Sequence, residues 1–140
     1  MRPLLVTARL LERMKACRVS LVKFRELWPE GCLVTVANIR QIRRQYLNPD
    51  WFCLSFIRKA PKAKRWYKER LDAAWHLRCV AVNRSWARTY NITRDTSSER
   101  IAARAQRVHD RKMWMANHMY DATHDWVIVV AINKAREERK

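Results

Sequence analysis

Residues 61–90 read PKAKRWYKERLDAAWHLRCVAVNRSWARTY, and this stretch decides the fold. It holds no Pro or Gly after Pro61, and Pro is well placed at a first helical position because no intrahelical bond is lost there. At about 100° per residue, seven apolar side chains share one side, which predicts one long helix. They are Tyr67, Leu71, Ala74, Trp75, Cys79, Val82 and Trp86. The spacing of 11 from Trp75 to Trp86 returns both indoles to one face and predicts a packing seam.

Two short helices are expected near the N-terminus. Apolar residues recur at helical spacing after Pro3 and again before Pro29-Glu30-Gly31, which ends the second run. The two stripes are Leu4, Ala8, Leu11 and Met14, then Leu21, Phe24 and Trp28. Both helices need a neighbour to cover these stripes.

A third helix and a buried segment follow. Thr35 is expected to cap the third helix, with Val34 packed against Ile39 as a hydrophobic staple. The predicted buried stripe is Val36, Ile39, Ile42 and Tyr46. After a break at residues 48–50, residues 51–57 are apolar all round, so we expect them to form the core.

The C-terminal part predicts a second long helix. Residues 91–98 read as a polar link, and Thr96 and Glu99 have the spacing of a capping box. The apolar stripe that follows is Ile101, Ala105, Val108, Met115 and Met119. Asp125 is expected to cap a last segment, in which residues 126–130 read equally as a strand, although residues 131–140 favour a helix.

These elements predict an all-α fold. A compact bundle of short helices, residues 1–58, is followed by a long basic helix and its antiparallel partner in residues 59–140, the two parts forming one cooperative unit. A single Gly among 140 residues argues against the hairpins of a sandwich or barrel. No stretch approaches the roughly 20 apolar residues of a membrane span.

Charge is the main functional signal of the sequence. The chain has 30 Lys and Arg against 13 Asp and Glu, a formal charge of +17. Such a charge repels itself in a compact fold and is usually balanced by an anionic partner, most often nucleic acid. Residues 58–90 carry 10 of the cations and 2 carboxylates, so the middle helix is the basic element.

Ten residues are candidates for contacting nucleic acid. Trp66 lies among cations and is expected to stack on a base, the alternative being that it packs on a neighbouring loop or helix. Lys64, Lys68 and Arg78 fall toward the apolar side, which contradicts a fully amphipathic helix unless their stems lie along the core edge. The candidate cations are Lys59, Lys62, Arg65, Arg70, Arg84 and Arg88 on the middle helix and Arg40, Arg43 and Arg44 on the third helix, whose alternative role is a solvated face.

No arrangement of residues predicts an enzyme. His109, His118 and His124 lie near aspartates, yet His118 and His124 are six residues apart and so do not share a helix face. We therefore expect no metal site, no cofactor and no catalytic residue, with a metal-dependent nuclease as the last alternative. The cysteines are Cys17, Cys32, Cys53 and Cys79; their wide spacing indicates reduced thiols and a cytoplasmic protein. The Arg-rich start leaves a mitochondrial transit peptide as the alternative location.

Residues 11–57 contain Ala16-Cys17, Phe24, Pro29-Glu30-Gly31, Val34-Thr35 and Asp50-Trp51. With these motifs the segment resembles one found in phage and bacterial proteins without an assigned activity, in which Ala- and Tyr-rich helical repeats often follow. Ala60-Pro61, Tyr67, Ala74-Trp75 and Ser85-Trp86 are similar to those repeats, although this copy is more basic and less regular. The resemblance covers about two-thirds of the chain and implies a phage-like origin.

Three functional hypotheses follow. The first is a small non-enzymatic protein that contacts nucleic acid, DNA or RNA, or a nucleoprotein complex. The second is an inhibitor or adaptor that blocks the nucleic-acid-binding surface or an acidic groove of a host protein, anchored by Trp66 and the region of Trp126. The third is a structural component of a ribonucleoprotein or virion. The apolar run 126–130 is also a candidate homo-oligomer contact.

Overall fold

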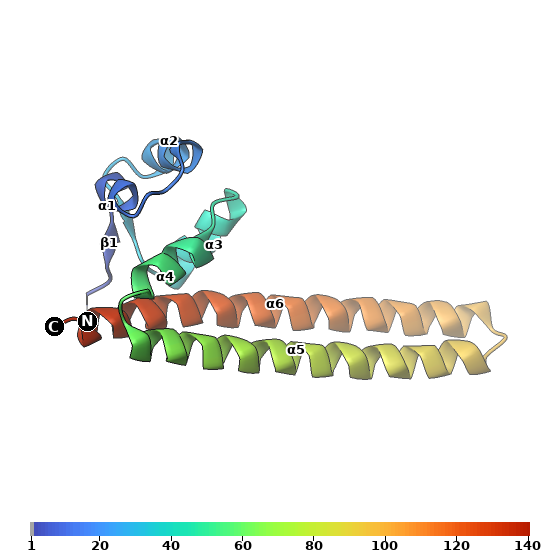
Figure 1. The fold of residues 1–140 in the computed structure, drawn as a ribbon. Helices are drawn as coiled ribbons and strands as arrows, with labels where there is room; N and C mark the ends of the chain where they lie inside the picture. Colours follow the sequence, from blue (N-terminus) through green and yellow to red (C-terminus); the bar gives the residue numbers. More distant parts are fainter. Residues whose placement is uncertain (1) are drawn as a thin grey trace. The chain divides into compact units, whose positions relative to one another are not determined.

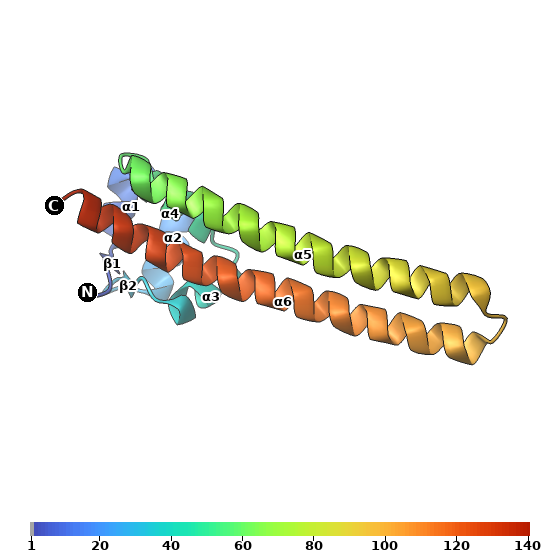
Figure 2. The ribbon, with the colours of Figure 1, turned by 90° about the horizontal axis from the view of Figure 1, so that it is seen from below.

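The computed structural model describes residues 2–140 and confirms the all-α prediction. Figure 1 shows the elements in chain order. They are β1 (Leu5–Val6), α1 (Ala8–Arg13), α2 (Arg18–Leu27), β2 (Cys32–Leu33), α3 (Val36–Arg44), α4 (Pro49–Ile57), α5 (Pro61–Asp95) and α6 (Glu99–Glu138). Figures 1 and 2 show α5 and α6 side by side and running in opposite directions, as expected of a helical hairpin.

The chain divides into two compact units. Unit 1 combines the residues up to Lys68 with Asp125–Lys140, and unit 2 is the continuous stretch Glu69–His124. Both α5 and α6 therefore contribute to both units. The expected division into domains 1–58 and 59–140 stays a prediction.

Local sequence accounts for the short elements of unit 1. The Thr7 hydroxyl caps α1 by accepting from the Leu10 N–H, and the Thr35 hydroxyl caps α3 by accepting from the Asn38 N–H, as expected for Thr35. Asn48 does the same for α4, whose first residue is Pro49. The first predicted helix is shorter than expected, because Leu5–Val6 pairs antiparallel with Cys32–Leu33. Two-residue strands leave almost no alternating pattern to read.

The core of unit 1 joins the short helices to the end of α6. Phe24, Ile39, Phe52 and Ile57 are buried, as are Val127, Ile128 and Ile132 from α6. The segment 126–130 is thus helical, and the strand alternative is wrong. Val127 and Ile128 are fully buried within the chain, so these two side chains are not available for the suggested oligomer contact.

Two predicted buried side chains in unit 1 are exposed. Tyr46 is 94% exposed because α3 ends at Arg44, and its positive φ of 57° turns it away from the helix stripe. Its ring lies 5.7 Å from Lys23 Nζ. Leu54 on α4 is 47% exposed, so that helix is not buried all round.

The link between the two long helices is shorter than predicted. Residues 91–95 continue α5, because no Pro or Gly interrupts the helix. The Thr89 and Thr93 hydroxyls donate to carbonyls one turn back. The expected Thr96 cap is also wrong: the Ser98 hydroxyl accepts from the Ile101 N–H at 3.5 Å, and Thr96 accepts from the Ser98 N–H. Asp125, expected at a helix start, lies inside the unbroken α6.

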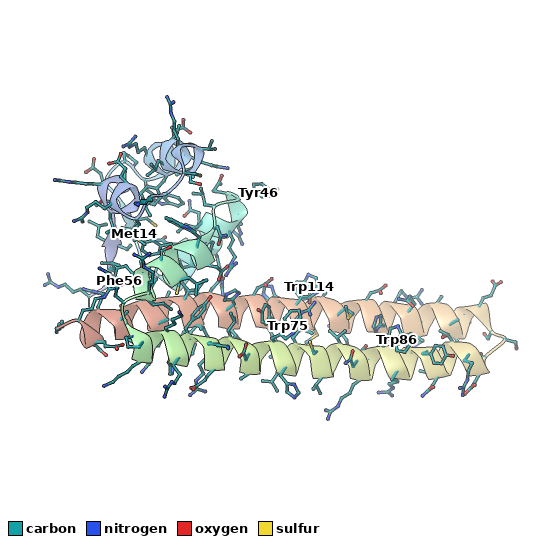
Figure 3. All side chains as sticks on the ribbon, viewed as in Figure 1. Met14, Tyr46, Phe56, Trp75, Trp86 and Trp114 are labelled. Atoms are coloured by element: carbon teal, nitrogen blue, oxygen red, sulfur yellow. The ribbon has the colours of Figure 1, made fainter. Side chains whose placement is uncertain are left out.

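In unit 2 the two helices meet through small and polar side chains. Ser85 and Ala105 are buried, the Ser85 hydroxyl is 2.9 Å from His109 Nδ1, and Arg78 Nε donates to Asn117 Oδ1 at 2.7 Å. The aromatic seam expected here is buried only in part: Trp75 is 49% and Trp86 57% exposed, and the Trp75 ring meets Tyr120 of α6 edge-on at a centroid distance of 5.5 Å. Figure 3 labels both indoles on α5. Compact residues allow close helix approach and leave the indoles at the edge of the interface.

Gly31 is required by the β1–β2 pairing. Its φ is +97°, and a Cβ there would lie 2.7 Å from the Val6 carbonyl oxygen. We predict that Gly31→Ala lowers the free energy of unfolding by about 2 kcal/mol or more, since backbone strain and overlap add. Urea denaturation followed by circular dichroism measures it. The neighbouring exposed Glu30→Ala should change stability by less than about 0.5 kcal/mol, and equal effects would contradict this account.

Candidate nucleic-acid interface

The turn between α4 and α5, together with the first two turns of α5, forms a basic segment of unit 1. Residues 58–68 contain six cations and no carboxylate. All six side chains are exposed, and within residues 2–140 none of them forms an ion pair. They are Arg58, Lys59, Lys62, Lys64, Arg65 and Lys68. Lys64 and Lys68 are exposed beside the buried Ala63 and Tyr67, in agreement with the alternative that their charged ends lie in water.

The start of α5 is fixed by a carboxylate from α6. Both Glu138 oxygens accept backbone bonds, from the Lys62 N–H at 3.2 Å and the Ala63 N–H at 3.1 Å. A negative group at a helix start satisfies otherwise orphaned N–H groups and complements the helix dipole. Ala60, Ala63 and Tyr67 are buried beneath the basic segment. The segment is consequently a defined helical surface.

Trp66 takes the packing role that the sequence left as its alternative. The ring is partly buried, and its centroid is 6.0 Å from that of Trp126 at an interplanar angle of 60°. Lys134 Nζ lies 5.3 Å from the Trp66 ring centroid. Stacking of Trp66 on a base stays a prediction.

Of the three arginines predicted on α3, two pair with carboxylates and one is exposed. Arg43 Nε donates to Asp125 Oδ1 at 2.8 Å, and its terminal nitrogen donates to Asp50 Oδ2 at 3.1 Å. Arg40 Nε lies 3.5 Å from Asp125 Oδ2. The charges of Arg40 and Arg43 are thus engaged inside unit 1. Arg44 is exposed and forms no ion pair in the described part of the chain.

Burial and charge shift two pKa values in this cluster. Burial alone would lower the pKa of Arg43, but the hydrogen bond to Asp125 and the charges of Asp50 and Asp125 raise it. Tyr67 donates its hydroxyl to Asp50 Oδ1 at 3.1 Å, and its pKa is raised, mainly by burial and then by the Asp50 charge. Arg43 stays charged and Tyr67 neutral at physiological pH.

The remaining predicted cations lie in unit 2. Arg70, Arg84 and Arg88 are exposed on α5. Arg88 borders a groove that also contains Arg104 and Lys112 of α6. The sequence alone does not single out Arg104 and Lys112, because their proximity to Arg88 depends on how two distant stretches of chain pair.

The histidines are distributed along unit 2. His109 bonds Ser85, the His118 ring stacks on Trp114 at 5.0 Å, and His124 is buried with its ring 5.6 Å from Tyr120. Within residues 2–140 no group of three or more His, Cys, Asp or Glu side chains is placed to hold a metal ion. Each of these three histidines has an identified structural contact.

No family model, curated protein or solved structure matches the chain. None of the helices in residues 2–140 combines the length and apolar character needed to cross a membrane.

Asp125 provides a test of how the arginine cluster supports the fold. We predict that Asp125→Asn lowers the free energy of unfolding by about 3 kcal/mol, because it leaves a partly buried Arg43 without its closest carboxylate. Urea denaturation measures the loss. Asp95→Asn removes the exposed partner of Arg94 and should cost less than about 1 kcal/mol. Comparable losses for the two variants would show that Asp125 has no special role.

The cysteines should differ in reactivity. The Ser20 hydroxyl and backbone lower the pKa of the exposed Cys17, whereas burial, followed by the Asp50 charge, raises the pKa of Cys53 to about 12. A lower pKa leaves more thiolate near neutral pH, so iodoacetamide should label Cys17 first and Cys53 last, as read by mass spectrometry. Ser20→Ala should slow labelling of Cys17 several-fold. Equal labelling of Cys17 and Cys53 in the folded protein would contradict the prediction.

Proposed function

We propose that the protein binds nucleic acid without catalysing a reaction, and that the basic segment 58–68 contacts the phosphates. The observation that carries the proposal is the set of six exposed cations within eleven residues, none of them ion-paired in the described chain. Lysine and arginine that displace counterions from phosphates supply most of the affinity of non-specific binding.

The distribution of charge between the units supports the same proposal. Unit 1 contains 20 cations and 7 carboxylates, whereas unit 2 contains 10 and 6. Asp50 and Asp125 are engaged by Arg43, Glu138 caps α5 and Glu12 pairs with Arg25, so four of the seven carboxylates of unit 1 have structural partners. The surface of unit 1 is therefore the more attractive of the two to a polyanion.

Binding through phosphates implies little base specificity, because every nucleotide carries the same phosphate. Both DNA and RNA are therefore candidate ligands. The further proposal of a virus-encoded accessory factor acting in the host cytoplasm rests only on the resemblance of residues 11–57 to phage and bacterial proteins. Arg44 in unit 1 and Arg70, Arg84 and Arg88 in unit 2 are proposed as further contacts, and Trp66 as a stacking residue.

Salt dependence tests the proposal. If about six phosphates are neutralised, the slope of log affinity against log salt on random duplex DNA should be near −5, measured by fluorescence anisotropy. The triple variant Lys59→Gln, Lys64→Gln, Arg65→Gln should reduce the slope by about 3.

A matched control separates a local site from net charge. Arg9→Gln, Arg13→Gln, Arg18→Gln removes the same charge from exposed positions elsewhere in unit 1 and should leave most of the slope intact. If both triple variants lose equal affinity, the basic segment is not a binding site. A slope near zero for the unaltered protein would overturn nucleic-acid binding altogether.

A further inference from the structure

A groove in unit 2 combines an apolar floor with a cationic rim. It has a volume of about 240 Å³ and lies between α5 and α6. The buried Ser85 and Ala105 lie at its bottom, Ile92, Ile101 and Val108 supply its apolar lining, and Arg88, Arg104 and Lys112 stand around it. These three cations are exposed, and none forms an ion pair within residues 2–140.

The floor continues along α6 as an exposed apolar stripe. Ile101 is 52% exposed, Val108 48%, Met115 48% and Met119 68%. Their spacings of seven, seven and four place all four on one helix face. The stripe runs over 19 residues, from Ile101 to Met119, and so measures about 27 Å along the axis, the length of a five-turn helix. Its two methionines are adaptable contact residues.

The cations and the carboxylates of α6 lie on different sides of the helix relative to this stripe. At about 100° per residue, Arg104, Arg111 and Lys112 flank it, whereas the carboxylates of this part of α6 project from the opposite side. Those carboxylates are Glu99, Asp110 and Asp121. The Gln106 amide donates to Asp110 at 2.9 Å, on that opposite side. On α6, an occupant of the stripe therefore meets cations and not carboxylates.

Charge and shape together select the occupant. A second copy would bring the arginines of one stripe against those of the other, and such like-charge contacts are costly. Nucleic-acid bases stack on aromatic side chains, and Val108, Met115 and Met119 offer them no aromatic ring. A helix with an apolar stripe between acidic side chains matches both the row of side chains and the flanking charge.

We propose that unit 2 docks an acidic amphipathic α-helix of another protein. The apolar side chains of that helix cover Ile101, Val108, Met115 and Met119, one of them entering the groove, and its carboxylates pair with Arg88, Arg104 and Lys112. This surface lies in unit 2 and is independent of the basic segment in unit 1.

The experiment uses the full chain and a fluorescent synthetic peptide of about 18 residues with Leu at heptad a and d positions and Glu beside them. A scrambled peptide of identical composition keeps the charge and loses the stripe. Fluorescence anisotropy should show at least tenfold tighter binding of the patterned peptide. Equal binding of the two peptides would overturn the proposal.

Two variants locate the binding. Val108→Glu should weaken the patterned peptide at least tenfold, and Met119→Glu serves the same purpose if circular dichroism shows that the first variant is misfolded. Ala103→Glu adds the same charge on the opposite face of α6 and should change binding less than twofold. Equal weakening by Ala103→Glu would indicate an effect of charge alone and would overturn docking at the stripe.

The other occupants are distinguishable. If Val108→Glu converts a dimer of the free protein into a monomer in sedimentation equilibrium, the stripe is a contact between copies and the proposal fails. If Val108→Glu weakens a single-stranded oligonucleotide as much as the peptide, the stripe is a nucleic-acid site and the proposal also fails. The triple variant of the basic segment should leave peptide binding within about threefold, which separates this test from that of nucleic-acid binding.

Discussion

The carboxylate of Asp125 is the contact on which unit 1 depends. It is almost fully buried, accepts from Arg43 and lies beside Arg40, so it joins α6 to α3. Arg43 extends the network to Asp50 of α4, which also accepts from Tyr67 of α5. A buried charge is tolerated only when it is paired and hydrogen-bonded, and here one network satisfies that condition with residues from four helices.

The sequence predicts the helices well because the breaking and capping signals are local. Thr35 caps α3 and Pro49 and Pro61 begin α4 and α5, each within one turn of the residues it affects. The predictions fail where a residue distant in the chain decides whether a side chain is paired or buried. Asp125 resembles a helix cap until Arg43 is seen beside it, and Trp75 resembles a core residue until Ser85 and Ala105 are seen to fill the interface.

The same distinction divides the candidate site. The exposed cations of segment 58–68 could be predicted because six charges without a carboxylate have no local partner. Arg40 and Arg43 have the same local appearance, yet their partner lies more than 80 residues away, at Asp125. Helix periodicity sorts residues by face and does not say which face a distant carboxylate will cover. The sequence likewise does not predict the cationic rim of the groove in unit 2, because Arg88 and Arg104 are brought together only by the pairing of α5 and α6.

The two units differ in how far apart in the chain their contacting residues lie. Unit 2 is one uninterrupted stretch closed by the short link after Asp95, so its helices meet across a small loop. Unit 1 must instead bring Asp125 to Arg43 across 82 residues. Closing a short loop costs less entropy and proceeds faster than forming distant contacts. We therefore expect the helical hairpin of unit 2 to form before the end of α6 packs against the N-terminal helices.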